Sequence, residues 1–549
     1  MVGRRRGRGW AVAAALAAMA VALAGLPRPV AATALPDLSG HWAEGPVRRL
    51  AAEGLVHGRP DGRFYPDAPL TRAEFLALLD RALEKLPEAA GGPAAPGTGA
   101  GAGTASLAGV PAGHWAAPVV SRLLGRGILR PEDYPNGIAL DGPITRREVA
   151  RLVVRAMGLE AEARSGRGVN RLLTDITRDP EARVITTAVA HGYLGGYPDG
   201  RFGPGDPLTR AQGAAVVLRL LDPAERTALW REQYQYNVGG AQVTVNVVRV
   251  NLRNPGLRPQ VVTAAGGIGQ VEDPMAMARR VGALAAINGT YLNAYTPQPP
   301  RDPYGTIIQG GRVLHRGADR AAIGFWPDGR ARIGYTSPSI LGGTWPRSWW
   351  AYGLNHTGTE WGENWIVVHT PDRGPDLGYD AGTSVVVENG VITRIVPGNV
   401  AIPRNGFVVS LGGTHVQEFL SRFSVGDPLD FRVELEPEWE GVSELLQAGP
   451  RLLADGQIAV DFAREGFVEE KITTLAWNRS AVGLTRDGYL LLVTTTGVRV
   501  LDLAEIMRDL GAWDAMCMDS GASSALYYRG QVITAPGRQI SNILAIVPR

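Results

Sequence analysis

The chain has 549 residues, of which 45% are hydrophobic and 20% are charged, and its formal net charge is +3. This length predicts two to four domains, and the composition excludes a mainly disordered chain. The charge bias is weak and no basic cluster carries interleaved aromatic residues, so we expect no nucleic-acid partner.

Residues 1–34 have the pattern of a signal peptide. Several arginines within the first eight residues precede an apolar, alanine-rich run from Trp10 to Leu26, and small residues around Ala32 and Ala34 offer cleavage sites. An uncleaved membrane anchor is the alternative, but the run is slightly short for a span. No other stretch is long and apolar enough, so we expect no membrane span after cleavage.

The next part of the chain contains three copies of one sequence unit. Residues 37–74 and 175–212 align without a gap, and residues 110–148 carry the same plan. Each copy has an opening segment, an amphipathic helix, a glycine-rich turn, and a Thr-Arg pair that begins a second helix. Thr71 with Glu74, and Thr145 with Glu148, match the capping-box pattern.

We place these copies and their connections from the composition shifts along the chain. An Ala/Gly/Pro-rich linker separates the first two copies, and a shorter spacer precedes the third. The resulting boundaries are 35–86, 107–158 and 172–222 for the copies, 87–106 for the linker and 159–171 for the spacer.

The copies resemble S-layer homology repeats through their HWA, DGRF and TRAE signatures. The resemblance implies an all-α, pseudo-symmetric module that binds secondary cell-wall polysaccharide. In that family the TRAE arginine and the opening tryptophan contribute to sugar grooves; a guanidinium can hold a carboxylate bidentately. The alternative for each arginine is a solvated first-turn residue. The corresponding positions are Trp42, Arg72, Trp115, Arg146 and Arg210.

The third copy departs from this pattern in two places. Asp179-Pro180 stands where the other copies have His-Trp, and Gln212 replaces the glutamate. We therefore expect its groove to be weakened.

Strand-like runs predominate in the C-terminal part, which we assign to a domain over residues 235–549. Turn pairs such as Asn389-Gly390 separate the runs. This pattern predicts a β-rich α+β domain, large enough for an enzyme pocket. The expected strands are 243–250, 384–388, 429–435 and 489–494, and the expected helices are 273–281, 417–423 and 501–510.

A single carboxylate, Asp519, lies between two apolar runs and is followed by small residues. These residues let a ligand approach the backbone and present hydroxyl and N–H groups that can face an anion. An ordinary turn is the alternative interpretation. Cys517, the one cysteine of the chain, excludes an internal disulfide and is expected in the core.

Four further motifs accompany the Asp519 stretch: Ala285–Tyr291, Leu446–Leu452, Arg479–Gly483 and Arg538–Asn542. Together and in this order they resemble the phosphodiester glycosidase family. The resemblance implies hydrolysis of a sugar-1-phosphodiester, a reaction with an oxocarbenium-like transition state. It implies catalytic roles for Asp519, Arg479 and Asn288, and substrate contacts from Ser520, Gly521, Ser523, Ser524, Arg538 and Asn542.

We assign Arg479 to the phosphate because a planar guanidinium suits two oxygens. Asp519 is assigned to the anomeric carbon, as a base or ion stabiliser, and Asn288 to a sugar hydroxyl or the attacking water. The alternatives are a structural pair between Arg479 and Asp519, and a turn cap for Asn288.

Three glycines of the family pattern are replaced in this chain. Thr290, Ser520 and Ala522 stand where the family has glycine. If those glycines have positive φ, the turn or the pocket must differ here.

The sequence predicts no certain cofactor. Asp519 could ligate a divalent cation, Ca²⁺ or Mg²⁺, but no dense carboxylate cluster accompanies it. The histidines lie at no metal-binding spacing, and we predict surface or satisfied core positions for His315, His356, His369 and His415.

Taken together, these features predict an extracellular hydrolase attached to the cell wall or S-layer. The repeats would hold it on cell-wall polysaccharide, and the C-terminal domain would cleave sugar-1-phosphodiester linkages in envelope or exopolysaccharide glycans. The alternative is a non-catalytic envelope protein that binds glycan or has a structural role.

Overall fold

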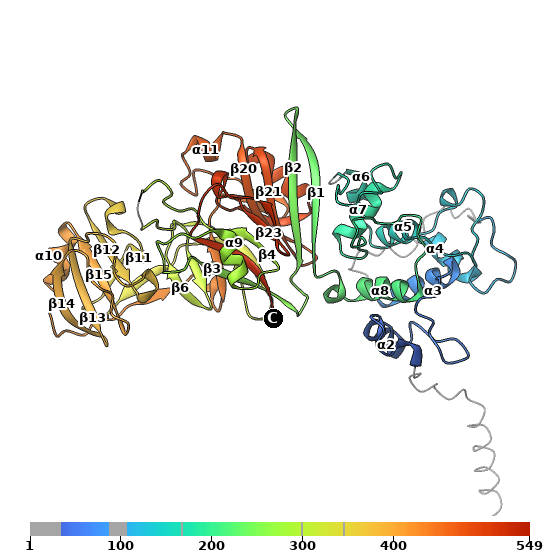
Figure 1. Ribbon diagram of the computed structural model, residues 1–549, viewed down its shortest axis with the longest axis horizontal. Helices are drawn as coiled ribbons and strands as arrows, with labels where there is room; N and C mark the ends of the chain where they lie inside the picture. The colour runs from blue at the N-terminus through green and yellow to red at the C-terminus, as the bar shows by residue number, and fades with distance from the viewer. Residues whose placement is uncertain (1–34, 87–106, 166–167, 298–299, 344–345) are drawn as a thin grey trace, which may run out of the picture.

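The computed structural model describes residues 35–86, 107–165, 168–297, 300–343 and 346–549. The predicted signal peptide and the linker at 87–106 lie outside the described residues. The repeats and the C-terminal domain follow one another along the long axis, with a lobe of the C-terminal domain at the far end (Figure 1). Among the described residues, no helix has the length and apolar character needed to cross a membrane.

The repeats form one unit around a shared apolar core, which we call the repeat module (residues 35–222). A threonine caps the second helix of each copy, accepting a hydrogen bond from the backbone N–H of Glu74, Glu148 or Gln212. A short helix also occupies part of the predicted spacer. The α-helices are α2 (Glu44–Ala52), α3 (Arg72–Lys85), α4 (Ala117–Gly125), α5 (Arg146–Ala156), α6 (Glu160–Ser165), α7 (Ala182–Ala190) and α8 (Arg210–Leu221).

The prediction of an all-α repeat module is wrong. The extended segments before α3, α5 and α8 pair with one another through isolated β-bridges. Leu70 donates its N–H to the carbonyl of Leu208, Leu208 to Ile144, and Ile144 back to Leu70, at 2.8–3.0 Å. Because the capping threonines hold these segments in extended conformation, their backbone groups form a closed ring between the copies instead of a helix.

Three sheets form the body of the β-rich C-terminal domain and enclose a common apolar core. The first has the order β1 (Leu229–Val238), β2 (Ala241–Asn251), β21 (Tyr489–Val498), β20 (Trp477–Thr485), β22 (Ala512–Cys517), β18 (Arg451–Ala454), β19 (Gln457–Ile458). The second is β24 (Gln531–Thr534), β23 (Leu526–Tyr528), β4 (Ala285–Asn288), β25 (Asn542–Pro548), β3 (Leu257–Thr263). The third is β6 (Arg312–His315), β5 (Ile307–Gln309), β17 (Glu444–Gln447), β7 (Arg320–Phe325), β8 (Ala331–Thr336).

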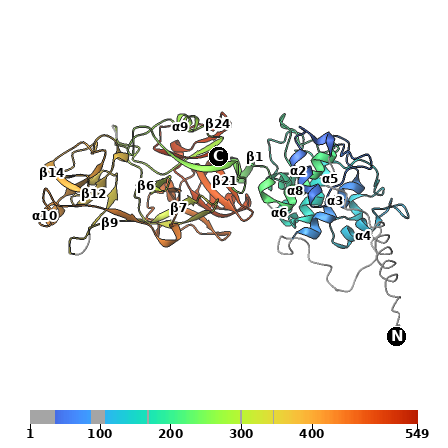
Figure 2. The ribbon, with the colours of Figure 1, turned by 90° about the horizontal axis from the view of Figure 1, so that it is seen from below.

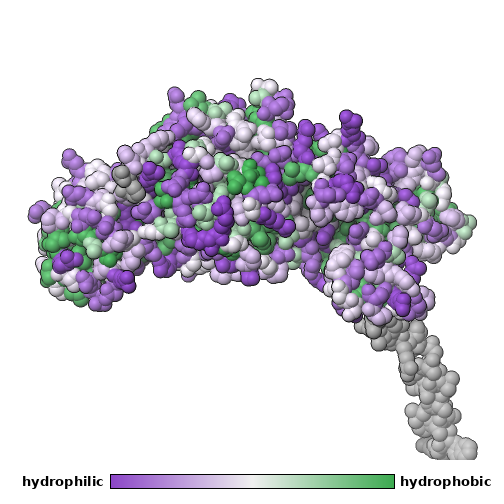
Figure 3. Space-filling view, in the orientation of Figure 1, coloured by the Kyte–Doolittle hydropathy of each residue, from purple (hydrophilic) through white to green (hydrophobic). Residues whose placement is uncertain are grey.

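A separate β-lobe, residues 339–434, projects from this body with its own core; we call it the insert lobe. Figure 2 shows it at the opposite end of the molecule from the repeat module, and apolar residues gather on the face seen in Figure 3. Its strands are β11 (Gly353–Leu354), β12 (Trp365–His369), β15 (Gly406–Gly412), β13 (Thr383–Glu388) and β14 (Val391–Pro397), with β10 (Trp349–Ala351), β9 (Ser339–Gly342) and β16 (Arg432–Glu434).

Helices are few in the C-terminal domain. They are α9 (Pro274–Arg280), α10 (Thr414–Leu420), α11 (Glu470–Thr473) and α12 (Val500–Asp509). α12 packs its apolar face on the outer side of the first sheet, and α10 begins before the helix expected at 417. β1 begins at Leu229, ahead of the boundary expected at 235.

The junction between the repeat module and this body is polar. His191 interacts through Nδ1 with Asp487 at 3.0 Å, and the Tyr489 hydroxyl donates to the carbonyl of His191 at 3.1 Å. Arg226 also pairs with Asp487, at 3.2 Å. These contacts connect the end of α7 to the hairpin between β20 and β21.

Candidate active site

A cavity of about 680 Å³ opens between the Asp519 turn and the insert lobe. Its lining comes from segments far apart in the sequence, which the sheets bring together. Ala481 pairs with Cys517 between β20 and β22, and Ile287 pairs with Leu526 between β4 and β23. The turn from β22 to β23, which carries Asp519, is thereby held beside the ends of β20 and β4.

Asp519 lines the cavity and is half-buried. Backbone bonds fix the turn, since the Asp519 N–H donates to Gly289 and the Met518 N–H donates to Ser480. Burial raises the pKa of Asp519 to about 6, against the opposing effects of Ser523, the Ser520 N–H, Arg538 and Lys471. Asp519 can therefore hold a proton near neutral pH, a different state from the ionised base that we expected.

The glycine departures leave this turn unstrained. Ser520 has φ −128° and ψ −176°, which is extended backbone open to any residue, and Ala522 lies in a short 3₁₀ turn. Gly521, with φ +67°, is the residue of the turn that needs glycine, and it is retained. At the neighbouring motif Gly289 is also retained, where a Cβ would lie 1.7 Å from Asn542 Oδ1.

Three cationic side chains line the same cavity: Arg479, Arg538 and Lys471. Arg479 is buried, and its Nε and Nη2 donate to carbonyls of Val498, Lys471 and Leu475. These bonds fix the guanidinium plane, and none of them uses Nη1. No described contact pairs Arg479 with Asp519, so the structure does not bring them together as an ion pair. Arg538 lies over the ring of Tyr295 at the rim.

The two predicted asparagines hold the turns around the cavity without lining it. Asn288 donates from Nδ2 to the Asp519 carbonyl at 2.6 Å and accepts from the Ala525 N–H at 3.0 Å. Asn542 accepts from the Thr290 N–H at 3.0 Å. Because both ends of its amide are bonded in this way, Asn288 positions the Asp519 turn. This role resembles the turn cap that the sequence analysis gave as the alternative for Asn288.

The serines of the turn divide into two groups. Ser520 lines the cavity beside Gly521, and its hydroxyl donates to the Met518 carbonyl at 3.1 Å. Ser523 and Ser524 are buried behind the turn and do not line the cavity. Of the small residues predicted to contact substrate, Ser520 and Gly521 are therefore the ones that reach the open space.

The cavity lining also includes a hydrogen-bonded chain that the sequence did not predict. His315 Nε2 lies 2.9 Å from His356 Nδ1, and His356 Nε2 lies 3.0 Å from Glu360 Oε2. We expected surface or satisfied core positions for both histidines, which are 41 residues apart along the chain. No local sequence motif predicts this contact, because it depends on how the insert lobe packs against β6.

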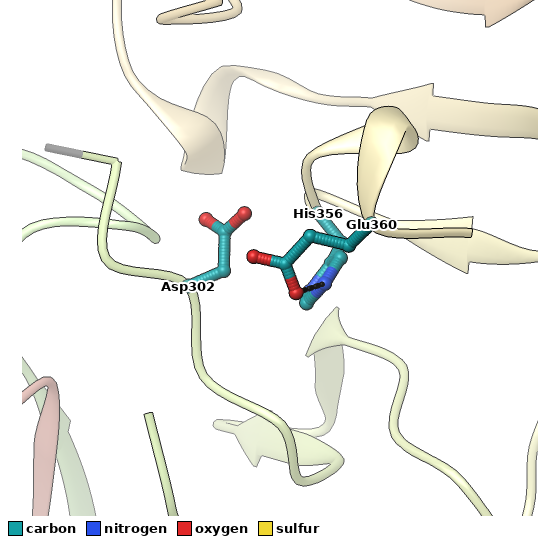
Figure 4. Close-up of side chains that lie close together, drawn as sticks. All are labelled: Asp302, His356 and Glu360. Atoms are coloured by element: carbon teal, nitrogen blue, oxygen red, sulfur yellow. Dashed lines mark hydrogen bonds and ion pairs between the residues drawn. The ribbon is translucent and has the colours of Figure 1, made fainter. Parts of the chain in front are cut away.

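Asp302, His356 and Glu360 place one potential ligand atom each within 4.8 Å of one another (Figure 4). All of these atoms already have partners. Asp302 forms an ion pair with Arg373 and accepts from the Thr357 N–H, and Asn293 donates to Glu360 Oε1 at 2.8 Å. With a guanidinium neutralising Asp302, this group does not fit a cation site. Ligation of a Ca²⁺ or Mg²⁺ ion by Asp519, the possibility raised by the sequence, is a separate question and stays a prediction.

In the repeat module, each predicted arginine reaches the next copy. Arg72 pairs with Glu148 at 2.6 Å and Arg210 with Glu74 at 2.6 Å, whereas Arg146 donates to the carbonyls of Phe202 and Gly195. A groove of about 120 Å³ brings Arg210 and Glu74 together with Trp115. Trp42 and Trp115 are 60% and 58% exposed, so both indoles are open to a ligand.

Comparison with known protein families gives two kinds of match. Residues 381–547 match the phosphodiester glycosidase family, and residues 34–76 and 173–214 match the S-layer homology domain. The second set coincides with the first and third predicted copies. Both resemblances seen in the sequence are thus confirmed.

Similar curated proteins align with part of the chain. The amylopullulanase of Thermoanaerobacterium thermosulfurigenes is 28% identical over 188 residues, which are 34% of this chain and 9% of that protein. The cellulosome-anchoring protein of Acetivibrio thermocellus is 28% identical over 169 residues, 31% of this chain and 35% of that protein. The surface-layer 125 kDa protein of Lysinibacillus sphaericus is 27% identical over 235 residues, 41% of this chain and 18% of that protein. The chain thus spans about a third or less of these relatives.

Among solved structures, a hypothetical protein from Synechocystis has a similar fold. Its TM-score is 0.54 at 23% identity, covering 59% of this chain and 62% of that chain. The expected location outside the cell, at the cell wall, is confirmed by the matches to surface-layer and cell-wall proteins. The chain is an extracellular, cell-wall-attached protein with S-layer homology domains and a phosphodiester glycosidase domain.

Proposed function

We propose that the C-terminal domain hydrolyses sugar-1-phosphodiester linkages in envelope or exopolysaccharide glycans. The observation that carries this proposal is the cavity that combines Asp519 with Arg479, Arg538 and Lys471. Cations suit the phosphodiester, and a carboxyl group that can hold a proton suits its cleavage. The match to the phosphodiester glycosidase family supports the same chemistry.

In the proposed reaction, water attacks the anomeric carbon and the bond from that carbon to the phosphate oxygen breaks. The electron pair goes to the phosphate oxygen, and a phosphate monoester leaves. Arg479, whose guanidinium plane is fixed by carbonyls, would bind the phosphate with its remaining nitrogen. Asp519 would deliver a proton to the departing oxygen, a role that its raised pKa favours.

The direct test measures sugar release by the full chain from a panel of α-sugar-1-phosphodiesters. We expect release by the wild type and a loss of at least about 100-fold in Asp519→Asn, since proton transfer contributes about 10²–10⁴-fold. Asp455→Asn, at an exposed turn outside the cavity, is the matched control and should keep wild-type rates. Binding of sugar phosphate without turnover by the wild type would favour the non-catalytic alternative.

We propose that the repeat module holds the chain on secondary cell-wall polysaccharide. The groove of Arg210, Glu74 and Trp115 supports this, because it combines a guanidinium with an exposed indole. Trp115→Ala should lower retention of the full chain on purified wall glycan. Trp350→Ala, which removes an indole of similar exposure from the insert lobe, should leave retention unchanged; equal losses in both variants would contradict the groove assignment.

A further inference from the structure

Two histidines and a glutamate line the same cavity as Asp519, and a role for them in catalysis rests on the proposed function. His315, His356 and Glu360 all line the cavity, and Glu360 is the member whose side chain is most open to it, at 28% exposed against 6% for His356. Figure 4 shows the Glu360 carboxylate directed at the His356 ring. A catalytic base is commonly oriented by a hydrogen bond from a further group, and His356 can serve Glu360 in this way.

The hydrogen bonds determine where the protons lie in this chain. His315 Nδ1 faces the Gly305 carbonyl at 2.8 Å, and a carbonyl can only accept, so Nδ1 carries a hydrogen. Burial lowers the pKa of His315 to about 3, so its ring is neutral and Nε2 accepts. His356 Nδ1 must then donate to it, which leaves His356 Nε2 and Glu360 Oε2 sharing a single proton.

We infer that Glu360 is a second catalytic carboxylate of this cavity, the base that takes a proton from the attacking water. His356 and His315 are positioning residues, which fix the carboxylate through His356 Nε2. Asn293 holds the other oxygen at 2.8 Å. This oxygen, Oε1, still has a lone pair that can accept a hydrogen bond from water.

The surrounding charges support this division of roles. Burial alone would raise the pKa of Glu360, but the bond and charge of His356 and the amide of Asn293 lower it, against the repulsion of Asp302. The phenol of Tyr304 also faces this carboxylate, and burial together with Glu360 and Asp302 raises the pKa of Tyr304 to about 12. Two carboxyl groups with opposite pKa shifts in one cavity are the pattern of a paired base and acid.

The step balances with the groups that are present. The water oxygen bonds to the anomeric carbon, and its proton passes to Glu360. The bond from that carbon to the phosphate oxygen breaks with its electron pair, and the proton of Asp519 goes to this oxygen. A single displacement by water, with one group as base and a separate group as acid, predicts inversion of the anomeric configuration.

The test uses the full chain and Glu360→Gln, which keeps the shape and removes the base. We expect kcat to fall by about 10²–10⁴-fold with KM little changed. Glu363→Gln is the matched control, because Glu363 is an exposed carboxylate of the same lobe that does not line the cavity; its kcat should stay within about twofold of wild type. In Glu360→Ala, azide should restore turnover and yield a glycosyl azide of inverted configuration.

His356→Gln provides a readout that a purely structural role would not move. Without the imidazole, the pKa of Glu360 should rise, so the acidic limb of the kcat/KM profile should move to higher pH. If the wild type turns over and Glu360→Gln is equally active, the assignment of Glu360 is wrong and the proposed function still stands. No turnover by the wild type would overturn the proposed function and this assignment with it.

Discussion

At the scale of single residues, the cavity depends on a few side chains in unfavourable environments. Asp519 is the clearest, because burial opposes its ionisation in the folded chain. At a pH where Asp519 is ionised, its burial lowers the free energy of unfolding. Functional residues often destabilise the fold in this way.

Asp519 should therefore make stability depend on pH. Its folded pKa of about 6 lies above the ordinary 3.8, so its relative stabilising contribution is full below pH 3.8 and is lost as the pH rises through 6. Asp519→Asn removes this penalty. We expect the variant to unfold a few degrees above the wild type at pH 8, and this gap to shrink by pH 4. Thermal unfolding at both pH values measures it, and a constant gap would show that the carboxyl does not titrate as described.

The sequence predicted the Asp519 turn of the cavity but did not predict the chain of Glu360, His356 and His315, and the reason is physical. The Asp519 turn is a local feature, so its small residues and its retained Gly521 can be recognised in one stretch. Glu360 and His356, by contrast, form a site only through their contacts with Asn293, after β4, and His315, on β6. These contacts depend on tertiary packing of the insert lobe, which no local periodicity encodes.

At the scale of elements, the repeat copies combine helix capping with contacts between copies. Glu74 and Glu148 each cap their own helix and also bind an arginine of another copy. The helices were predictable from period and caps. The backbone ring was not, because it needs three distant segments to meet, although each segment by itself is short and irregular.

The third copy offers a test of this arrangement. Arg146 is buried, its pKa is lowered by burial, and among the described residues it forms no ion pair. Gln212 occupies the position of Glu74 and Glu148, so Gln212→Glu should keep the cap and give Arg146 a partner. We expect a gain of about 1 kcal/mol in the free energy of unfolding, measured by denaturant titration.

The matched control reverses this change in another copy. Glu148→Gln removes the partner of Arg72 and should destabilise the chain by a similar amount. A neutral or destabilising Gln212→Glu, alongside a destabilising Glu148→Gln, would show that the third copy departs in geometry as well as in sequence.

At the scale of the whole molecule, the repeat module and the C-terminal domain meet through charged groups around His191. Burial alone would lower the pKa of His191, but the carboxylates of Glu162 and Asp487 outweigh it and raise the pKa. Arg226, Tyr193 and Tyr489 complete the surroundings. The protonated imidazole thus joins a carboxylate from each side of the junction.

This junction should weaken as the pH rises. The folded pKa of His191 lies above 6.5, so its stabilising contribution is full below pH 6.5 and is lost as the pH rises through the folded pKa. We expect His191→Gln to lower the unfolding temperature at pH 6 and to have a much smaller effect at pH 9. An equal loss at both pH values would indicate packing in place of charge.

The central claim is that the C-terminal domain breaks the bond between the anomeric carbon and the phosphate oxygen. The most direct measurement is turnover of a sugar-1-phosphodiester by the full chain in H₂¹⁸O, followed by ³¹P NMR of the released phosphate monoester. We predict a monoester without ¹⁸O, because water attacks carbon and the phosphate keeps its own oxygens. A monoester carrying ¹⁸O would show attack at phosphorus and contradict the glycosidase mechanism.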